Sequence, residues 1–241
     1  MDGMMKNVEE RRAEELKRFL SRLGVDWLHT SLDLSIIDEA LTHTSAGLSR
    51  DHERLEFLGD AVLRLACTEY IDRKHPNLPV GKRSELRAQL VSDQWLSELG
   101  ESINIETVLL TGRHAKQDRN AAATLRAEAT EALIGALYLQ PHGLDQVHAW
   151  LTDHWESSSA AVLSRPDLFN SKSALQEWSQ ARNLGLPGYE TGEQSLGHGD
   201  PRRFRSCVRI GELITSEGWG RSRKEAERQA AQAALQALQE F

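Results

Sequence analysis

The sequence predicts an all-α domain followed by a small α+β domain with the element order α-β-β-β-α. From about residue 7 to residue 164, apolar residues recur at spacings of three and four, which is typical of helices. This periodicity changes at residues 157–170, a stretch that contains several serines and a proline. After it come one helical stretch, three short alternating runs and a second helical stretch. We therefore expect two domains, residues 1–164 and residues 165–241.

The second domain is expected to form a three-stranded antiparallel sheet with both helices on one face. In one run, Phe204, Val208 and Ile210 alternate with arginines, as in a strand with one face on a core. We expect Trp178 and Trp219 to pack in the core or between helix and sheet. The expected helices cover about 171–182 and 222–240, and the expected strands lie within 186–193, 203–210 and 213–220.

The composition favours a folded, cytoplasmic protein. A length of 241 residues accommodates two ordinary domains, and no stretch approaches the roughly 20 apolar residues of a membrane span. The N-terminal segment alternates charged and apolar residues and lacks the apolar core of a secretory signal. Cys67 and Cys207 lie far apart in the sequence, so neither a disulfide framework nor a zinc site is expected.

The net charge of −7 hides an uneven distribution along the chain. Residues 1–164 carry 18 Lys and Arg against 26 Asp and Glu, whereas residues 165–241 carry 11 against 10. Eight of those basic residues fall between Arg202 and Arg228. A local basic cluster in a small α+β domain favours contact with a nucleic-acid backbone.

Acidic residues share one face of each of two predicted helices in the first domain. On a helical wheel Glu53, Glu56 and Asp60 lie within about 60° of one another, and Glu128 and Glu131 are three residues apart. If these helices pack side by side, their carboxylates converge, and oxygen ligands without His or Cys suit Mg²⁺ or Mn²⁺. On spacing alone, a solvated face is the commoner explanation. The apolar positions expected to pack are Leu55, Leu58, Val62 and Leu65, and Leu133, Ile134 and Leu137.

Four segments of the first domain resemble the catalytic domain of ribonuclease III, in the order of that family. The resemblance implies that Asp60 and Glu131 are catalytic and that these two residues, with Glu56 and Glu128, hold a divalent metal. Glu53 would support the site or hold a second metal. The segments are ALTHTS (40–45), ERLEFLGDAVL (53–63), SELRAQLVS (84–92) and EATEALIGALYL (128–139).

Two positions depart from the family pattern. The family usually has aspartate where this chain has Glu128, and the longer side chain could retune the rate or the metal preference. It usually has asparagine where this chain has His52, which is open to two interpretations, a variation at a helix N-cap and a chemical role.

Residues 171–235 resemble a double-stranded RNA-binding domain. Ser222, Arg223 and Lys224 open the closing helix, whose free N–H groups and dipole favour phosphate. By the resemblance, three further residues contact 2′-hydroxyls and base edges across minor grooves, and a glutamate replaces a common lysine, which should weaken phosphate contact. The three contact residues are Gln176, Glu177 and His198, and the glutamate is Glu227. The matching segments are SKSALQEWSQ (171–180), LPGYE (186–190), GHGDPRRF (197–204) and GRSRKEAERQAAQAAL (220–235).

The combined resemblance implies an endoribonuclease that hydrolyses double-stranded RNA with Mg²⁺, or with Mn²⁺ as the alternative ion. Its products would carry 5′ phosphates and short 3′ overhangs, and its role would be processing of ribosomal or messenger RNA. The sequence has no phosphate-binding glycine loop, so we expect no nucleotide cofactor. The alternative is a catalytically weakened RNA-binding protein of the same fold, in which Glu128 has disabled the metal site. A third hypothesis, a helical scaffold without RNA, leaves the RNA-binding resemblance unexplained.

A homodimer is expected because Phe57 lies away from the apolar stripe of its helix, about 40° from Glu53 on the wheel. An aromatic ring at that position needs a partner. In the family, the corresponding phenylalanine packs into a pocket of a second subunit. A two-fold dimer would place one acidic site on each RNA strand.

Overall fold

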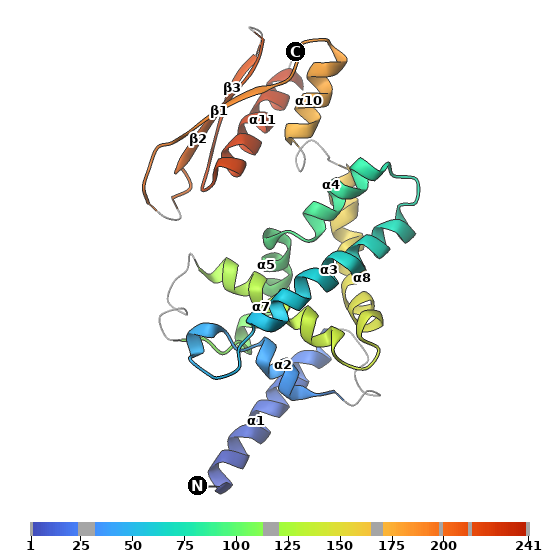
Figure 1. Cartoon of the computed structure of the whole chain (residues 1–241), viewed down its shortest axis with the longest axis vertical. Coiled ribbons are helices and arrows are strands. Elements are labelled where there is room, and N and C mark those ends of the chain that lie inside the picture. Colours follow the sequence, from blue (N-terminus) through green and yellow to red (C-terminus); the bar gives the residue numbers. More distant parts are fainter. Residues whose placement is uncertain are drawn as a thin grey trace. The chain divides into compact units, whose positions relative to one another are not determined.

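The structure, a computed structural model, describes residues 2–23, 32–112, 121–164, 171–197, 200–211 and 214–239, without the side chains of 2–9, 214 and 239. Its internal contacts divide the chain into two compact units, Met1–Ser159 and Ala160–Phe241. The first unit is helical, and the second has the order α-β-β-β-α, so the predicted fold class is confirmed (Figure 1). Helix α8 runs across this division and ends at Ser164.

The first unit is built on two helices, α3 and α7, that pack side by side in its middle (Figure 1). The other described helices of this unit lie around the pair (Figure 1). The described elements are α1 (Asp2–Ser21), α2 (Leu34–Ala40), η2 (Thr44–Ala46), α3 (Glu53–Lys74), α4 (Val80–Leu90), α5 (Asp93–Ser102), η3 (Ile105–Thr107), α7 (Ala122–Tyr138) and α8 (Gly143–Ser164).

Helices α3 and α7 cross at two glycines, where their backbones touch. A Cβ added at Gly59 would lie 1.9 Å from the carbonyl oxygen of Glu131. One added at Gly135 would lie 2.2 Å from the carbonyl oxygen of Leu55. Real Cβ atoms do not approach backbone so closely, so only glycine fits at either position. This contact brings the acidic segments of the two helices together.

The buried face of α3 differs in part from the predicted one. Leu55 and Val62 are buried as expected, but Leu65 is 50% exposed. The buried stripe instead runs through Gly59, Leu63, Ala66 and Tyr70. The cause is the glycine crossing, because α7 packs against the side of α3 that carries Gly59. On α7, the predicted core residues Leu133, Ile134 and Leu137 are all fully buried.

The second unit holds a three-stranded antiparallel sheet in the order β1-β2-β3. The predicted alternation is confirmed, because Ser206, Val208 and Ile210 are buried, whereas Arg205 and Arg209 are exposed. Both helices lie on one face of the sheet (Figure 1). The elements are α10 (Ser171–Ala181), β1 (Gly188–Glu193), β2 (Phe204–Ile210), β3 (Ile214–Gly220) and α11 (Arg223–Gln239).

Strand β3 approaches α11 closely because both surfaces carry small residues. A Cβ at Gly218 would lie 2.1 Å from the backbone nitrogen of Ala230. Trp219 lies between Gly218 and Gly220, which both face α11 closely. Its side chain therefore points to the opposite face of the sheet, with the guanidinium groups of Arg202 and Arg205 over its ring. The expectation of helix–sheet packing was wrong for Trp219. Trp178 packs against the core of this unit, as expected.

Neither cysteine of the chain forms a disulfide. Cys67 and Cys207 are both free thiols, and burial raises the pKa of the Cys67 thiol to about 12. Among the described residues, no helix combines the length and the apolar character that a membrane span requires.

We predict that Gly59→Ala lowers the free energy of unfolding by about 3 kcal/mol, because its methyl group overlaps the backbone of α7. Gly81→Ala is the matched control, since an added Cβ at this helical glycine meets nothing within 4 Å. That variant should be neutral or stabilising by up to about 1 kcal/mol. Urea denaturation followed by circular dichroism measures both. Equal stability of the two variants would contradict the backbone contact.

Candidate active site

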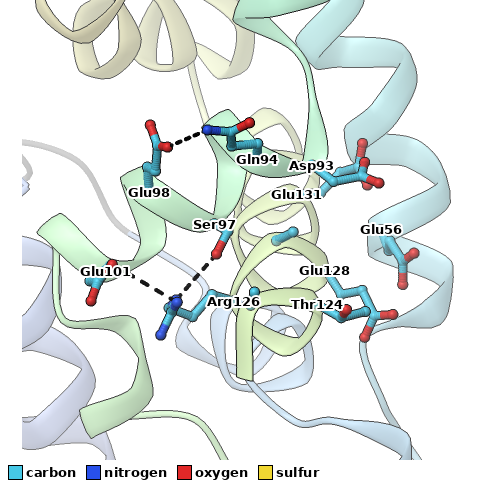
Figure 2. Close-up of a pocket in the computed structure, with 12 residues that line it drawn as sticks. Glu56, Asp93, Gln94, Ser97, Glu98, Glu101, Thr124, Arg126, Glu128 and Glu131 are labelled. Carbon is cyan, nitrogen blue, oxygen red and sulfur yellow. Dashed lines mark hydrogen bonds and ion pairs between the residues drawn. The ribbon is translucent and has the colours of Figure 1, made fainter. Parts of the chain in front are cut away.

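Four carboxylates meet where α3 crosses α7. Glu56 and Asp60 lie one helical turn apart on α3, and Glu128 and Glu131 lie on the facing side of α7. Glu56, Glu128 and Glu131 line a cavity of about 430 Å³. In Figure 2 these three side chains gather on the α3 side of the cavity. The two helices therefore pack side by side, and their carboxylates converge as the sequence analysis expected for that arrangement.

Burial and mutual repulsion raise the pKa of two members of this cluster, Glu131 and Glu56. Burial raises the pKa of Glu131 from 4.5 to about 7, with further contributions from the charges of Asp60, Glu56 and Asp93. Burial also raises the pKa of Glu56, and Glu128 and Glu53 add to that effect. Each carboxylate of the cluster disfavours ionisation of its neighbours, so a cation bound among them would stabilise the ionised forms.

Asp93 belongs to the cluster, and the sequence reasoning missed it. It is the first residue of α5, a helix whose N-cap residue Ser92 accepts a hydrogen bond from the Trp95 N–H at 3.2 Å. It lines the same cavity as Glu131 and raises the pKa of that carboxyl group. The pair Ser92–Asp93 is a recognisable helix start, but no spacing rule connects it to α3 or α7.

The arginines near the cluster leave much of its charge uncompensated. Arg64 Nε donates to Asp60 Oδ1 at 2.7 Å, which neutralises and orients that carboxylate. Arg126, although it lines the cavity, is turned toward α5 and η3, where it binds Glu106 at 2.8 Å and Ser97 at 3.3 Å. Figure 2 shows its contacts with Ser97 and Glu101 of α5. The residues present therefore fit a divalent cation, because they offer several oxygen donors with excess negative charge.

Two histidines also reach the carboxylates, contrary to the expectation of a site without His. The His52 side chain is 4% exposed, and its Nε2 lies 3.2 Å from Glu56 Oε2 and 3.7 Å from Glu128 Oε2. His43 Nε2 lies 3.5 Å from Glu128 Oε2, and the two rings stack with centroids 4.8 Å apart. His52 precedes α3 but makes no side-chain capping bond. The interpretation of His52 as a capping variation is therefore not supported, and a chemical role stays a prediction. His43 was missed as a site residue.

The remaining predicted residues of α3 lie at the edge of the site. Glu53 is exposed, and its charge acts on Glu56. Phe57 is 85% exposed, so no described part of its own chain covers the ring.

The predicted phosphate-binding residues lie at the start of α11. Ser222 caps this helix, because the Glu225 N–H donates to its Oγ at 3.2 Å. Arg223 and Lys224 are exposed in the first turn, and Arg223 also donates to the Thr191 carbonyl at 3.3 Å. Unpaired N–H groups and the positive end of the helix dipole add to these charges.

The rest of the basic cluster is partly neutralised within the second unit. Arg203 pairs with Glu193, Arg205 with Glu217 and Arg209 with Glu190. Gln176 and Glu177 are exposed on α10, whereas His198 lies outside the described residues. Glu227, expected to weaken phosphate contact, forms an ion pair with Lys172.

The fold and the site together define a class of protein, a helical hydrolase domain with an acidic centre joined to a module for duplex RNA. Residues 33–155 match the family described as Ribonuclease-III-like, and residues 171–238 match the double-stranded RNA binding motif. The chain belongs to the ribonuclease III family.

Individual relatives agree with this assignment. Ribonuclease 3 of Prochlorococcus marinus is 48% identical, with 96% of each chain covered. A second ribonuclease 3 of Synechocystis is 38% identical and covers 93% of this chain and 92% of its own. The solved nuclease domain of ribonuclease III from Campylobacter jejuni, described as flexible in a region involved in dimer formation, is 31% identical. It aligns with a TM-score of 0.51 and covers 56% of this chain and 95% of its own.

We predict that Glu131→Gln stabilises the metal-free protein at pH 8 by about 1–2 kcal/mol, after allowance for solvent screening. The folded-state pKa of about 7 lies above the ordinary value of 4.5, so ionisation of Glu131 destabilises the fold as pH rises between these values. The difference between variant and wild type should therefore vanish near pH 4.5. Thermal unfolding in a chelator measures it, with Glu98→Gln on the same cavity as control. A variant less stable than wild type at pH 8 would contradict the repulsion.

Proposed function

We propose that this member of the ribonuclease III family hydrolyses double-stranded RNA at the four-carboxylate site. The observation that carries the proposal is the convergence of Glu56, Asp60, Glu128 and Glu131 at the glycine crossing, in a chain that also has a double-stranded RNA binding motif. Such a site serves hydrolysis of phosphodiesters, which needs concentrated positive charge at the phosphate and no covalent intermediate on the protein.

Mg²⁺ is the ion that we propose for the site, held by these four carboxylates, with Glu53 as a supporting or second-metal group. When bound, such an ion neutralises the negative charge that develops on the phosphodiester. Mn²⁺ is the alternative.

Asp60 and Glu131 are the residues to which we assign catalysis. The Arg64 hydrogen bond of 2.7 Å fixes the orientation of the Asp60 carboxylate. Glu131 keeps its proton up to a pH of about 7 in the metal-free site. It must release this proton before it can bind a cation, so cation affinity should rise as pH increases through that range.

RNA binding is assigned to the second unit. The capped start of α11 provides two cations and free N–H groups for phosphates through Ser222, Arg223 and Lys224. Gln176, Glu177 and His198 are proposed to contact the minor groove. Because these contacts address the shape of the A-form duplex, the module selects double-stranded RNA with little regard to sequence.

Assembly into a homodimer is proposed because Phe57 presents an uncovered aromatic ring beside the site. Two sites related by a two-fold axis would each cut one strand, which gives 5′-phosphate products with short 3′ overhangs. In the cytoplasm, such an enzyme would process ribosomal or messenger RNA.

The test of the proposed function is incubation of the purified protein with a perfect RNA duplex in Mg²⁺, in Mn²⁺ and in a chelator. Sizing and end analysis of the products should show short duplexes with 5′ phosphates in the presence of an ion. The alternative, a catalytically weakened RNA-binding protein, predicts tight binding of the intact duplex under all three conditions.

We predict that Asp60→Asn and Glu131→Gln each lower the cleavage rate by about 10³-fold, equivalent to about 4 kcal/mol of lost transition-state stabilisation. Duplex binding should change less than about twofold, because the phosphate-binding residues lie in the other unit. Asp72→Asn is the matched control, since Asp72 lies on the same helix but pairs with Arg83. Near-normal cleavage by either site variant would refute the assignment.

We predict that Phe57→Ala promotes monomers and reduces cleavage of both strands. Loss of a fully buried ring costs about 3–5 kcal/mol of packing free energy, enough to weaken a dimer by at least 10²-fold. Sedimentation velocity measures the change, with the half-exposed Leu65 on the same helix replaced by alanine as the control. A wild-type protein that sediments as a monomer at micromolar concentration, yet cuts both strands, would exclude the dimer.

A further inference from the structure

His52 places a buried imidazole nitrogen in an otherwise acidic site. Its Nε2 lies between two carboxylates from different helices, 3.2 Å from Glu56 Oε2 and 3.7 Å from Glu128 Oε2. A side chain this buried next to two acids needs a defined role, because burial of polar groups without compensation costs free energy.

The hydrogen bonds of His52 fix which nitrogen carries the proton. Nδ1 lies 3.2 Å from the Thr42 carbonyl oxygen, and the same oxygen accepts the backbone N–H of His52 at 2.9 Å. A carbonyl oxygen only accepts, so neutral His52 carries its proton on Nδ1. Its Nε2 then presents a lone pair to Glu56 and Glu128. Three electron-pair donors facing one another repel unless a metal ion lies among them or a second proton on the ring makes Nε2 a hydrogen-bond donor.

His43 has the opposite arrangement. Its Nδ1 accepts the Ser45 N–H at 3.0 Å, so neutral His43 carries its proton on Nε2. That N–H faces Glu128 Oε2 at 3.5 Å. His43 therefore orients the carboxylate of Glu128 and is not itself a donor to a metal, although both histidines and Glu128 have candidate ligand atoms within 4.8 Å of one another.

We infer that His52 Nε2 is a ligand of a divalent ion that it shares with Glu56 and Glu128, and that this nitrogen raises the affinity of the site for Mn²⁺ relative to its affinity for Mg²⁺. This inference rests on the proposed nuclease function. Two ligand atoms about 2.1 Å from a common ion lie about 3.0–3.6 Å apart at angles of 90–120°, close to the distances observed. Imidazole nitrogen binds divalent transition ions, Mn²⁺ among them, better than it binds Mg²⁺, which prefers oxygen and near-ideal octahedral geometry.

The direct test is pulsed electron paramagnetic resonance of Mn²⁺ bound to the metal-free full chain. An imidazole nitrogen bound to Mn²⁺ produces a ¹⁴N modulation of the spin echo. We expect this modulation in the wild type and its loss in His52→Asn. Asparagine is chosen because its amide N–H₂ can still donate to the Thr42 carbonyl, as Nδ1 does, while it has no counterpart of Nε2.

Affinity provides a second readout. Calorimetric titration should show that His52→Asn weakens Mn²⁺ binding at least tenfold, while Mg²⁺ binding changes less than about threefold. His52→Gln, which places an amide oxygen near the former Nε2, should likewise lose the ¹⁴N signal. The matched control is His148→Asn, because His148 of α8 also faces a glutamate, Glu69, at 2.7 Å. Glu69 lies about 20 Å further along α3 than Glu56. Circular dichroism confirms that each variant is folded.

The outcomes separate this inference from the proposed function. Absence of ¹⁴N modulation in a wild type that cleaves duplex RNA overturns the nitrogen ligand and leaves the nuclease intact. Equal Mn²⁺ affinities of wild type and His52→Asn also overturn it, and would indicate that His52 binds the carboxylates as an imidazolium. A wild type with the ¹⁴N signal that cleaves no duplex in either ion would refute the proposed function instead.

Discussion

Backbone contact between α3 and α7 at Gly59 and Gly135 is the constraint on which the site depends. Any side chain at these positions would separate the helices, since a Cβ would meet the opposite carbonyl at about 2 Å. The close approach sets Glu56 and Asp60 against Glu128 and Glu131. Burial, together with repulsion from its acidic neighbours, raises the pKa of Glu131 to about 7. Apolar packing along the rest of the two helices supplies the free energy that holds these groups together.

That repulsion is also the source of affinity for a cation. On the proposed function, a divalent ion binds the folded protein at carboxylates that the unfolded chain does not assemble, so its binding would stabilise the fold. The free energy that destabilises the metal-free site is then recovered as binding free energy. Arg64 binds Asp60 at 2.7 Å, and Arg126 is turned toward Glu106. The local arrangement of arginines therefore leaves the centre of the cluster to a cation from solution.

The helical and strand periodicities of the sequence predicted which residues share a face of one element. They missed the residues that tertiary structure brings together from different elements. The helical period predicted the acidic faces of both helices, and the strand period predicted the alternation of Val208 and Ile210 in β2. The prediction for Leu65 was wrong because the glycine crossing places the buried face of α3 elsewhere. The prediction for Trp219 was wrong because the close fit of β3 on α11 turns that ring to the other face of the sheet. Asp93 and His43 come from other elements, and no spacing in the sequence connects them to the acidic helices.

The second unit concentrates positive charge where it is useful for binding a duplex. Three arginines of the sheet region pair with glutamates, whereas Arg223 and Lys224 are exposed beside the free N–H groups of α11. Contacts of this kind address phosphates and carry no base information. On the proposed function, the choice among RNA duplexes depends on helical regularity and on the geometry that the carboxylate site imposes on the scissile phosphodiester. A site held rigid by backbone contact between two helices is suited to impose that geometry.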